Sequence, residues 1–80
     1  MTHYTRNGNE IWVRTHALKR AVERGITPSM IEATILGGRI QKFGKNRVKF
    51  IKQYKRGKVI CVDECIRQNT ILIVTIEWGK

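Results

Sequence analysis

The sequence has few acidic side chains and no long apolar run. Only 6 Asp and Glu stand against 16 Lys and Arg, so the formal net charge of the 80 residues is +10 at pH 7. An excess of this size bears on partners rather than on the fold, and it favours a polyanion. Nucleic acid is favoured over a membrane, because the chain contains no run of roughly 18 apolar residues.

Cysteine is scarce as well, since Cys61 and Cys65 are the only two. Both fall in a segment that reads as a strand, where four residues span about 13 Å, whereas a disulfide bridges α-carbons only up to about 7 Å apart. Two ligands at this spacing also lack the paired C-x-x-C arrangement of a zinc site. The sequence therefore predicts small buried thiols, no metal site and no cofactor. Together with a first segment that lacks the apolar core of a secretory signal, this predicts a cytoplasmic protein.

The chain is expected to hold one domain, over residues 11–80, preceded by a flexible arm over residues 1–10. The arm is polar and contains an Asn-Gly-Asn stretch, which is typical of a loop. Apolar residues then recur at helical spacing over residues 15–24 and 28–36. A Thr-Pro pair, which is a typical helix start, precedes the second segment, and glycines follow both. Two N-terminal helices are therefore predicted.

Beyond the helices, β-branched and aromatic residues gather in four runs separated by turn residues: 39–43, 47–54, 58–66 and 70–78. The predicted fold class is α+β, with the two helices packed on one face of a three- to four-stranded antiparallel sheet. If the last two turns hold two residues each, one sheet face carries the residues that pack on the helices: Val48, Phe50, Tyr54, Val59, Cys61, Cys65, Leu72, Val74, Ile76 and Trp78. A turn one residue longer would exchange the faces of neighbouring strands.

Segment 39–58 holds nine basic residues, no acidic residue and three aromatic ones. Cations at this density neutralise phosphates, and aromatic rings stack on bases, so the segment is a candidate nucleic-acid-binding surface. The candidate binding residues are Lys42, Arg47, Lys49, Lys52 and Lys55. The alternative is a solvated edge strand, because lysine also protects exposed sheet edges from aggregation.

A second candidate site lies on the first predicted helix, where His16, Arg20 and Arg24 follow one another at intervals of four residues. Cations at this spacing repel each other, and a phosphate would remove that cost while accepting bidentate hydrogen bonds from the guanidinium groups. The positive end of the helix and Arg20 both disfavour a charged imidazole, and a neutral one is what a general base needs. The alternative is the plain exposed face of an amphipathic helix.

The stretch HALKRAVERGIT, a second helix with Ile31 and Ile35, and a final strand ILIVTIEW resemble a family of small prokaryotic and phage-associated domains that begin with a His-Ala-x-x-Arg helix. That family is distantly similar to the RelE, barnase, colicin and EndoU group of metal-independent ribonucleases. The resemblance implies a toxin-like, RelE-like RNase fold over residues 11–80. It also implies four candidate catalytic residues: His16, Arg20, Arg24 and Thr75.

The sequence therefore leaves two candidate functions open. The first is RNA binding with metal-independent endoribonuclease activity, in which an RNA 2′-hydroxyl serves as the nucleophile. The second is a non-catalytic nucleic-acid-binding or accessory protein of a mobile element. RNA or another nucleic acid is the expected partner in both, and an acidic antitoxin-like protein is a further candidate. Trp12 and Trp78 are core or interface residues, and the sequence does not decide between these roles.

Overall fold

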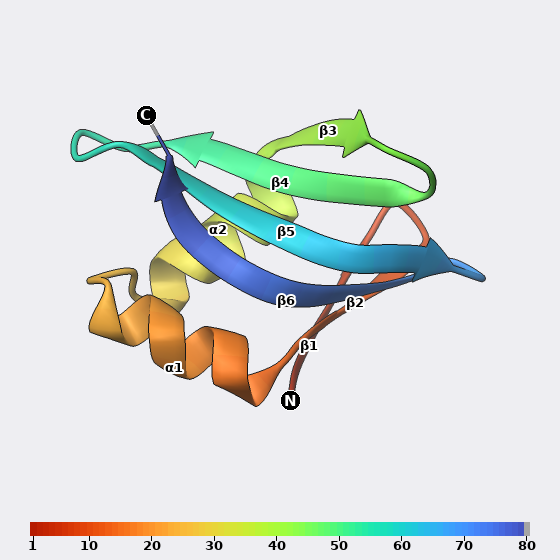
Figure 1. Cartoon of the computed structure of the whole chain (residues 1–80), viewed down its shortest axis with the longest axis horizontal. Coiled ribbons are helices and arrows are strands. Elements are labelled where there is room, and N and C mark those ends of the chain that lie inside the picture. Colours follow the sequence, from red (N-terminus) through yellow and green to blue (C-terminus); the bar gives the residue numbers. More distant parts are fainter. Residues whose placement is uncertain (80) are drawn as a thin grey trace.

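The computed structural model describes residues 1–79, with the side chains of all of these except Cys65 and Ile66. It contains six strands and two helices (Figure 1). In chain order these are β1 (Thr2–Arg6), β2 (Asn9–Val13), α1 (Thr15–Glu23), α2 (Pro28–Gly37), β3 (Arg39–Phe43), β4 (Arg47–Gln53), β5 (Lys58–Arg67) and β6 (Thr70–Gly79). Both helices lie where the apolar spacing predicts them.

All six strands form one mixed sheet in the order β1-β2-β6-β5-β4-β3. Strand β2 runs parallel to β6, and the other neighbouring strands are antiparallel. The prediction of three or four antiparallel strands is therefore wrong. Its error lies at the N-terminus, because the first thirteen residues contribute two strands that were not counted.

The expected flexible arm is in fact the larger part of a β-hairpin. Arg6 pairs with Asn9 across a two-residue loop, in which Asn7 and Gly8 both have positive φ, at 53° and 80°. This is the Asn-Gly turn that joins twisted antiparallel strands most readily. The hairpin is also tied to α2, because Nη1 of Arg6 donates hydrogen bonds to the carbonyls of Ile35 (3.0 Å) and Gly38 (2.8 Å).

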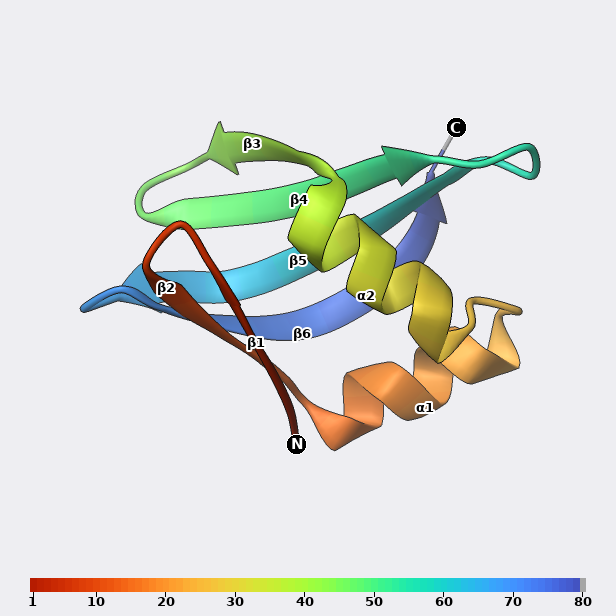
Figure 2. The ribbon, with the colours of Figure 1, turned by 180° about the vertical axis from the view of Figure 1, so that it is seen from behind.

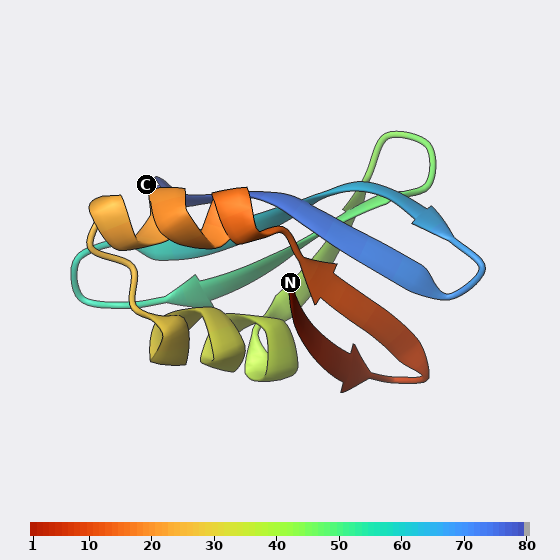
Figure 3. The same cartoon turned by 90° about the horizontal axis from the view of Figure 1, so that it is seen from below.

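The two helices take different places against the sheet. We call the sheet face that is turned towards the helices the inner face, and the opposite one the outer face. Helix α2 lies across the inner face and packs against β4, β5 and β1 (Figure 2). Helix α1 packs against β6 (Figure 3). Strand β2 pairs only with the first part of β6, and α1 lies along the part of β6 that follows. The core between helices and sheet consists of Ile11, Val13, Ala17, Ala21, Ile26, Ile31, Ile35, Val48, Phe50, Val59, Cys61, Ile71, Ile73 and Ile76.

The strand faces follow the predicted pattern in β4 and β5 but not throughout β6. The β4–β5 loop holds four residues rather than two, since Gln53 pairs with Lys58. A change of two residues leaves the inward alternation unchanged. Val48, Phe50, Val59 and Cys61 are therefore buried, as predicted, and the predicted burial of Cys65 lies outside the described side chains.

A β-bulge explains why some residues of β6 face the opposite side of the sheet from the predicted one. Val62 pairs with Thr75 and Asp63 pairs with Ile73, so Val74 has no partner of its own on β5. The extra residue reverses the alternation upstream of it. Ile71 and Ile73 consequently face the core, where Leu72 and Val74 were expected, while Ile76 beyond the bulge is buried as predicted.

Candidate functional site

The four residues predicted as catalytic border one pocket between α1 and β6. His16, Arg20 and Arg24 line it from the helix, and Thr75 lines it from the strand, in a cavity of about 130 Å³. Ala17 from the helix and Val74 and Ile76 from the strand complete the lining. The side chains that the sequence suggested for phosphate contact thus lie together, although 51 positions separate Arg24 from Thr75 in the numbering.

Small residues on α1 let the helix approach β6 closely enough to form the pocket. Ala17 and Ala21 are buried against the core, and the polar row lies beside them on the same side of the helix. On the opposite wall, the bulge lets Val74 and Thr75 both lie between the inward-facing Ile73 and Ile76. Bulges often redirect side chains at binding sites in this way.

The C-terminal end of α1 is fastened to β6 at the far end of the pocket. Nη1 of Arg24 donates a hydrogen bond to the carbonyl of Ile76 (2.8 Å), which uses one of the five guanidinium donors. In return, Nε1 of Trp78 donates to the carbonyl of Arg24 (2.7 Å). The guanidinium of Arg56 lies 5.0 Å from the Trp78 ring centroid, so a further cation stands beside the ring that is bonded to Arg24.

The polar side chains that line the pocket are hydrogen-bond donors or cations. It offers two guanidinium groups, one imidazole and one hydroxyl, and no carboxylate is among the described lining residues. Guanidinium pairs bind phosphate oxygens with bidentate, charge-assisted hydrogen bonds. His16 is exposed on the first turn of α1, within reach of an incoming ligand. The pocket can therefore hold a phosphate group and present an imidazole beside it.

The five predicted nucleic-acid-binding residues do not share one surface. Arg47 and Lys49 lie on the outer face, where their charged groups stand 4.6 and 5.2 Å from the Phe43 ring centroid. Lys52 pairs with the inward-facing Val59 and lies on the helix side of the sheet. Lys42 likewise pairs with the buried Val48 and borders a separate cavity under the β1–β2 hairpin. Lys55 belongs to the β4–β5 loop.

The outer-face cations are nevertheless connected to the pocket. Lys49 pairs with Val62, and Val62 pairs with Thr75, so these three residues form one row across the sheet. Neighbouring strands lie about 4.8 Å apart, so the α-carbons of Lys49 and Thr75 are about 9.5 Å apart. A nucleic-acid strand that crosses the outer face could contact Lys49 and reach the pocket.

Comparison with known proteins adds no family assignment. No protein-family model matches the chain, and neither a curated protein nor a solved structure matches it. The resemblance to a toxin-like ribonuclease family therefore stays a prediction. In the part of the chain that the structure describes, no helix has the length and apolar character to cross a membrane. Among the same residues, no three His, Cys, Asp or Glu side chains gather as a metal site would require.

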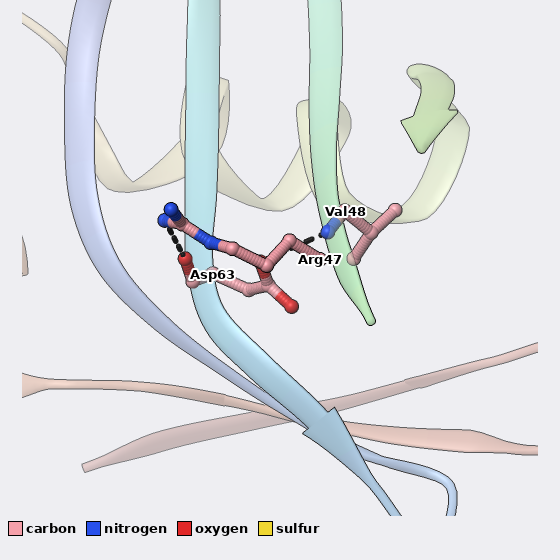
Figure 4. Close-up of polar contacts among 3 residues, drawn as sticks. All are labelled: Arg47, Val48 and Asp63. Atoms are coloured by element: carbon pink, nitrogen blue, oxygen red, sulfur yellow. Dashed lines mark hydrogen bonds and ion pairs between the residues drawn. The ribbon is translucent and has the colours of Figure 1, made fainter. Parts of the chain in front are cut away.

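A buried carboxylate behind the outer-face cations escaped the sequence reasoning. Asp63 is fully buried, and its Oδ1 accepts a hydrogen bond from the Val48 amide at 2.9 Å (Figure 4). The same oxygen lies 3.8 Å from Nε of Arg47, whose Nη2 donates to the Asp63 carbonyl at 2.7 Å. Burial raises the pKa of Asp63, while the Val48 amide and the Arg47 charge act against that rise. Arg47 is thus tethered by the fold, and the only sequence signal was an acidic residue at an inward position of β5.

Proposed function

We propose that the protein binds RNA with a phosphodiester in the pocket between α1 and β6, and cleaves the strand without a metal ion. The observation that supports this is the convergence of His16, Arg20, Arg24 and Thr75 on one cavity. The net charge of +10 attracts a polyanion, and Lys49 on the outer face extends the positive surface beyond the pocket.

In the proposed reaction, the imidazole of His16 takes the proton from the ribose 2′-hydroxyl. The 2′-oxygen attacks phosphorus, and the bond to the 5′-oxygen breaks, which leaves a 2′,3′-cyclic phosphate and a 5′-hydroxyl. Arg20 and Arg24 stabilise the negative charge that grows on the phosphoryl oxygens, and the Thr75 hydroxyl donates a hydrogen bond to one of them. The Ile76 carbonyl holds the Arg24 guanidinium in place for this role.

One observation favours non-catalytic binding as the second candidate. His16 is the single candidate general acid or base in the described lining. The departing 5′-oxygen must also gain a proton, and no second acid is among the lining residues that the structure describes, so water or the His16 imidazolium has to supply it. An accessory protein that grips a phosphate and does no chemistry needs no such group. We also propose that the protein is cytoplasmic and that an acidic antitoxin-like protein is a further partner, which would compete with RNA for the same cations.

Cleavage of labelled RNA in EDTA separates the two candidates. Wild-type protein should produce fragments with 2′,3′-cyclic phosphate ends, whereas RNA with 2′-O-methyl riboses should stay intact. His16→Ala, purified identically, should bind with nearly unchanged affinity and cut nothing, while Arg20→Ala should lose both affinity and activity. Tight binding by the wild type without any cleavage would select the non-catalytic candidate. Equal cleavage by the wild type and His16→Ala would remove His16 from the mechanism.

A further inference from the structure

An aromatic pair on the β1–β2 hairpin has no part in the phosphate pocket. His3 and Trp12 face each other across the two strands, with ring centroids 4.3 Å apart and ring planes inclined by 36°. The neighbours of Trp12 in β2, Ile11 and Val13, point into the core, so the indole lies on the outer face of the sheet. Nε2 of His3 also lies 3.3 Å from a carboxylate oxygen of Glu10, which holds the imidazole in place.

The pair lies next to the pocket along the same face. Trp12 is the register partner of Leu72, which precedes the pocket-lining Val74 by two residues. One strand spacing and two residues of strand together place the α-carbons of Trp12 and Val74 about 8 Å apart. This is a distance that a single nucleotide spans, so a base attached to a phosphate in the pocket reaches the indole.

We propose that Trp12, held by His3, is a base-stacking subsite next to the phosphate pocket, and that the ligand is therefore single-stranded RNA. The proposal rests on the proposed function, because the pocket supplies the phosphate contact. Stacking on an aromatic ring requires an unpaired base, which a duplex does not offer. It also tolerates any base, since every base has a π-face. Trp12 therefore selects strandedness and not sequence.

Phe43 is a second aromatic residue on the outer face, and two cations already contact its ring. The charged groups of Arg47 and Lys49 stand over Phe43, so cations cover this ring. Phe43 also belongs to β3, at the opposite edge of the sheet from the β1–β2 hairpin. Phe43 is therefore the matched aromatic control for Trp12.

The test compares two ligands that share one backbone: a 2′-O-methyl uridine oligomer, and the same oligomer without bases. Wild-type protein should bind the oligomer with bases about 10-fold more tightly, which corresponds to about 1.4 kcal/mol. The ratio should fall to about 1 in Trp12→Leu, which keeps an apolar side chain, and persist in Trp12→Phe and in Phe43→Leu. Duplex RNA should bind no better than the oligomer without bases.

The outcomes separate the subsite from the pocket. Equal binding of both oligomers by the wild type, with both weakened in Arg20→Ala, would overturn the subsite and leave the pocket standing. No binding of either oligomer would overturn the proposed function and the subsite with it. A ratio lost in Phe43→Leu and kept in Trp12→Leu would overturn the subsite alone. If Trp12→Leu does not fold, the fluorescence of the wild type minus that of Trp12→Phe isolates the Trp12 emission, which the uridine oligomer should quench and the oligomer without bases should not.

Discussion

Replacing Arg47 with alanine tests whether this cation serves the fold or the ligand. Its guanidinium donates to the Asp63 carbonyl at 2.7 Å and stands 3.8 Å from the buried Asp63 carboxylate. Arg47→Ala removes the nearest positive charge from a carboxylate that stays fully buried. Lys49→Ala is the matched control, because Lys49 lies on the same strand and over the same Phe43 ring but faces no buried acid.

The expected loss of stability is moderate and depends on pH. Breaking a fully buried ion pair costs about 3–5 kcal/mol, but the Arg47 side chain is 40% exposed, so water screens its charge and about 1–2 kcal/mol is expected. The Arg47 charge opposes the rise that burial imposes on the pKa of Asp63, so Arg47→Ala raises that pKa further. The loss of stability caused by Arg47→Ala has its full size at a pH above the pKa of Asp63. It shrinks as the pH falls through that pKa, because a protonated carboxyl group needs no cation beside it.

Thermal unfolding of the wild type and both variants, from pH 7 down to pH 4, measures these effects. At pH 7, Arg47→Ala should unfold about 5–15 °C below the wild type, and the gap should narrow towards pH 4. Lys49→Ala should stay within about 3 °C of the wild type throughout. A gap for Arg47→Ala that does not change with pH would refute the role of the ion pair. Equal stability of all three proteins at pH 7 would refute the structural role of Arg47 altogether.

Three further predictions concern a glycine after α1 and its control, a lysine on the outer face, and the tryptophan of β6. Gly25→Ala should destabilise the fold by about 1–2 kcal/mol in urea unfolding, because φ is +79° there, whereas Gly37→Ala, with open space around it, should be neutral or stabilise by up to about 1 kcal/mol. In salt titrations of RNA binding, Lys49→Ala should reduce the slope of log K against log salt by about 0.7, and an unchanged slope would remove Lys49 from the interface. Trp78→Phe removes the hydrogen bond to the Arg24 carbonyl, so it should cost about 1 kcal/mol of stability and lower RNA affinity together; unchanged affinity would show that the pocket does not need this bond.

Local patterns in the sequence account for the helices and for three of the four candidate site residues. The spacing of His16, Arg20 and Arg24 fixes a common helix face, and the cap at Thr27, whose side chain accepts a hydrogen bond from the Met30 amide, marks where α2 begins. The fourth pocket residue has no such pattern. It came from a family resemblance, and its position depends on a bulge in a segment that is apolar on both faces and so gives no signal of where its alternation reverses.

Two of the remaining differences between sequence and structure have a common cause, which is tertiary contact overriding local composition. The N-terminal residues are polar and read as an arm, yet Arg6 is held by the end of α2 and completes a hairpin. Asp63 is charged, yet the fold buries it, where the Val48 amide donates a hydrogen bond to one of its carboxylate oxygens and the Arg47 charge lies 3.8 Å away. Lys42 and Lys52 looked like members of one basic surface, but strand alternation places them on the helix side of the sheet.

The pocket has one wall near each end of the chain, since the hydrogen bond between Arg24 and Ile76 spans 52 residues. During synthesis, α1 emerges long before β6, and no part of the chain that ends before β6 contains both walls. A ribosome that is still translating the middle of this message therefore carries a fragment with only one wall of the pocket. The pocket is complete only when the sixth strand docks, so the phosphate contact that we propose for it waits until the polypeptide has folded.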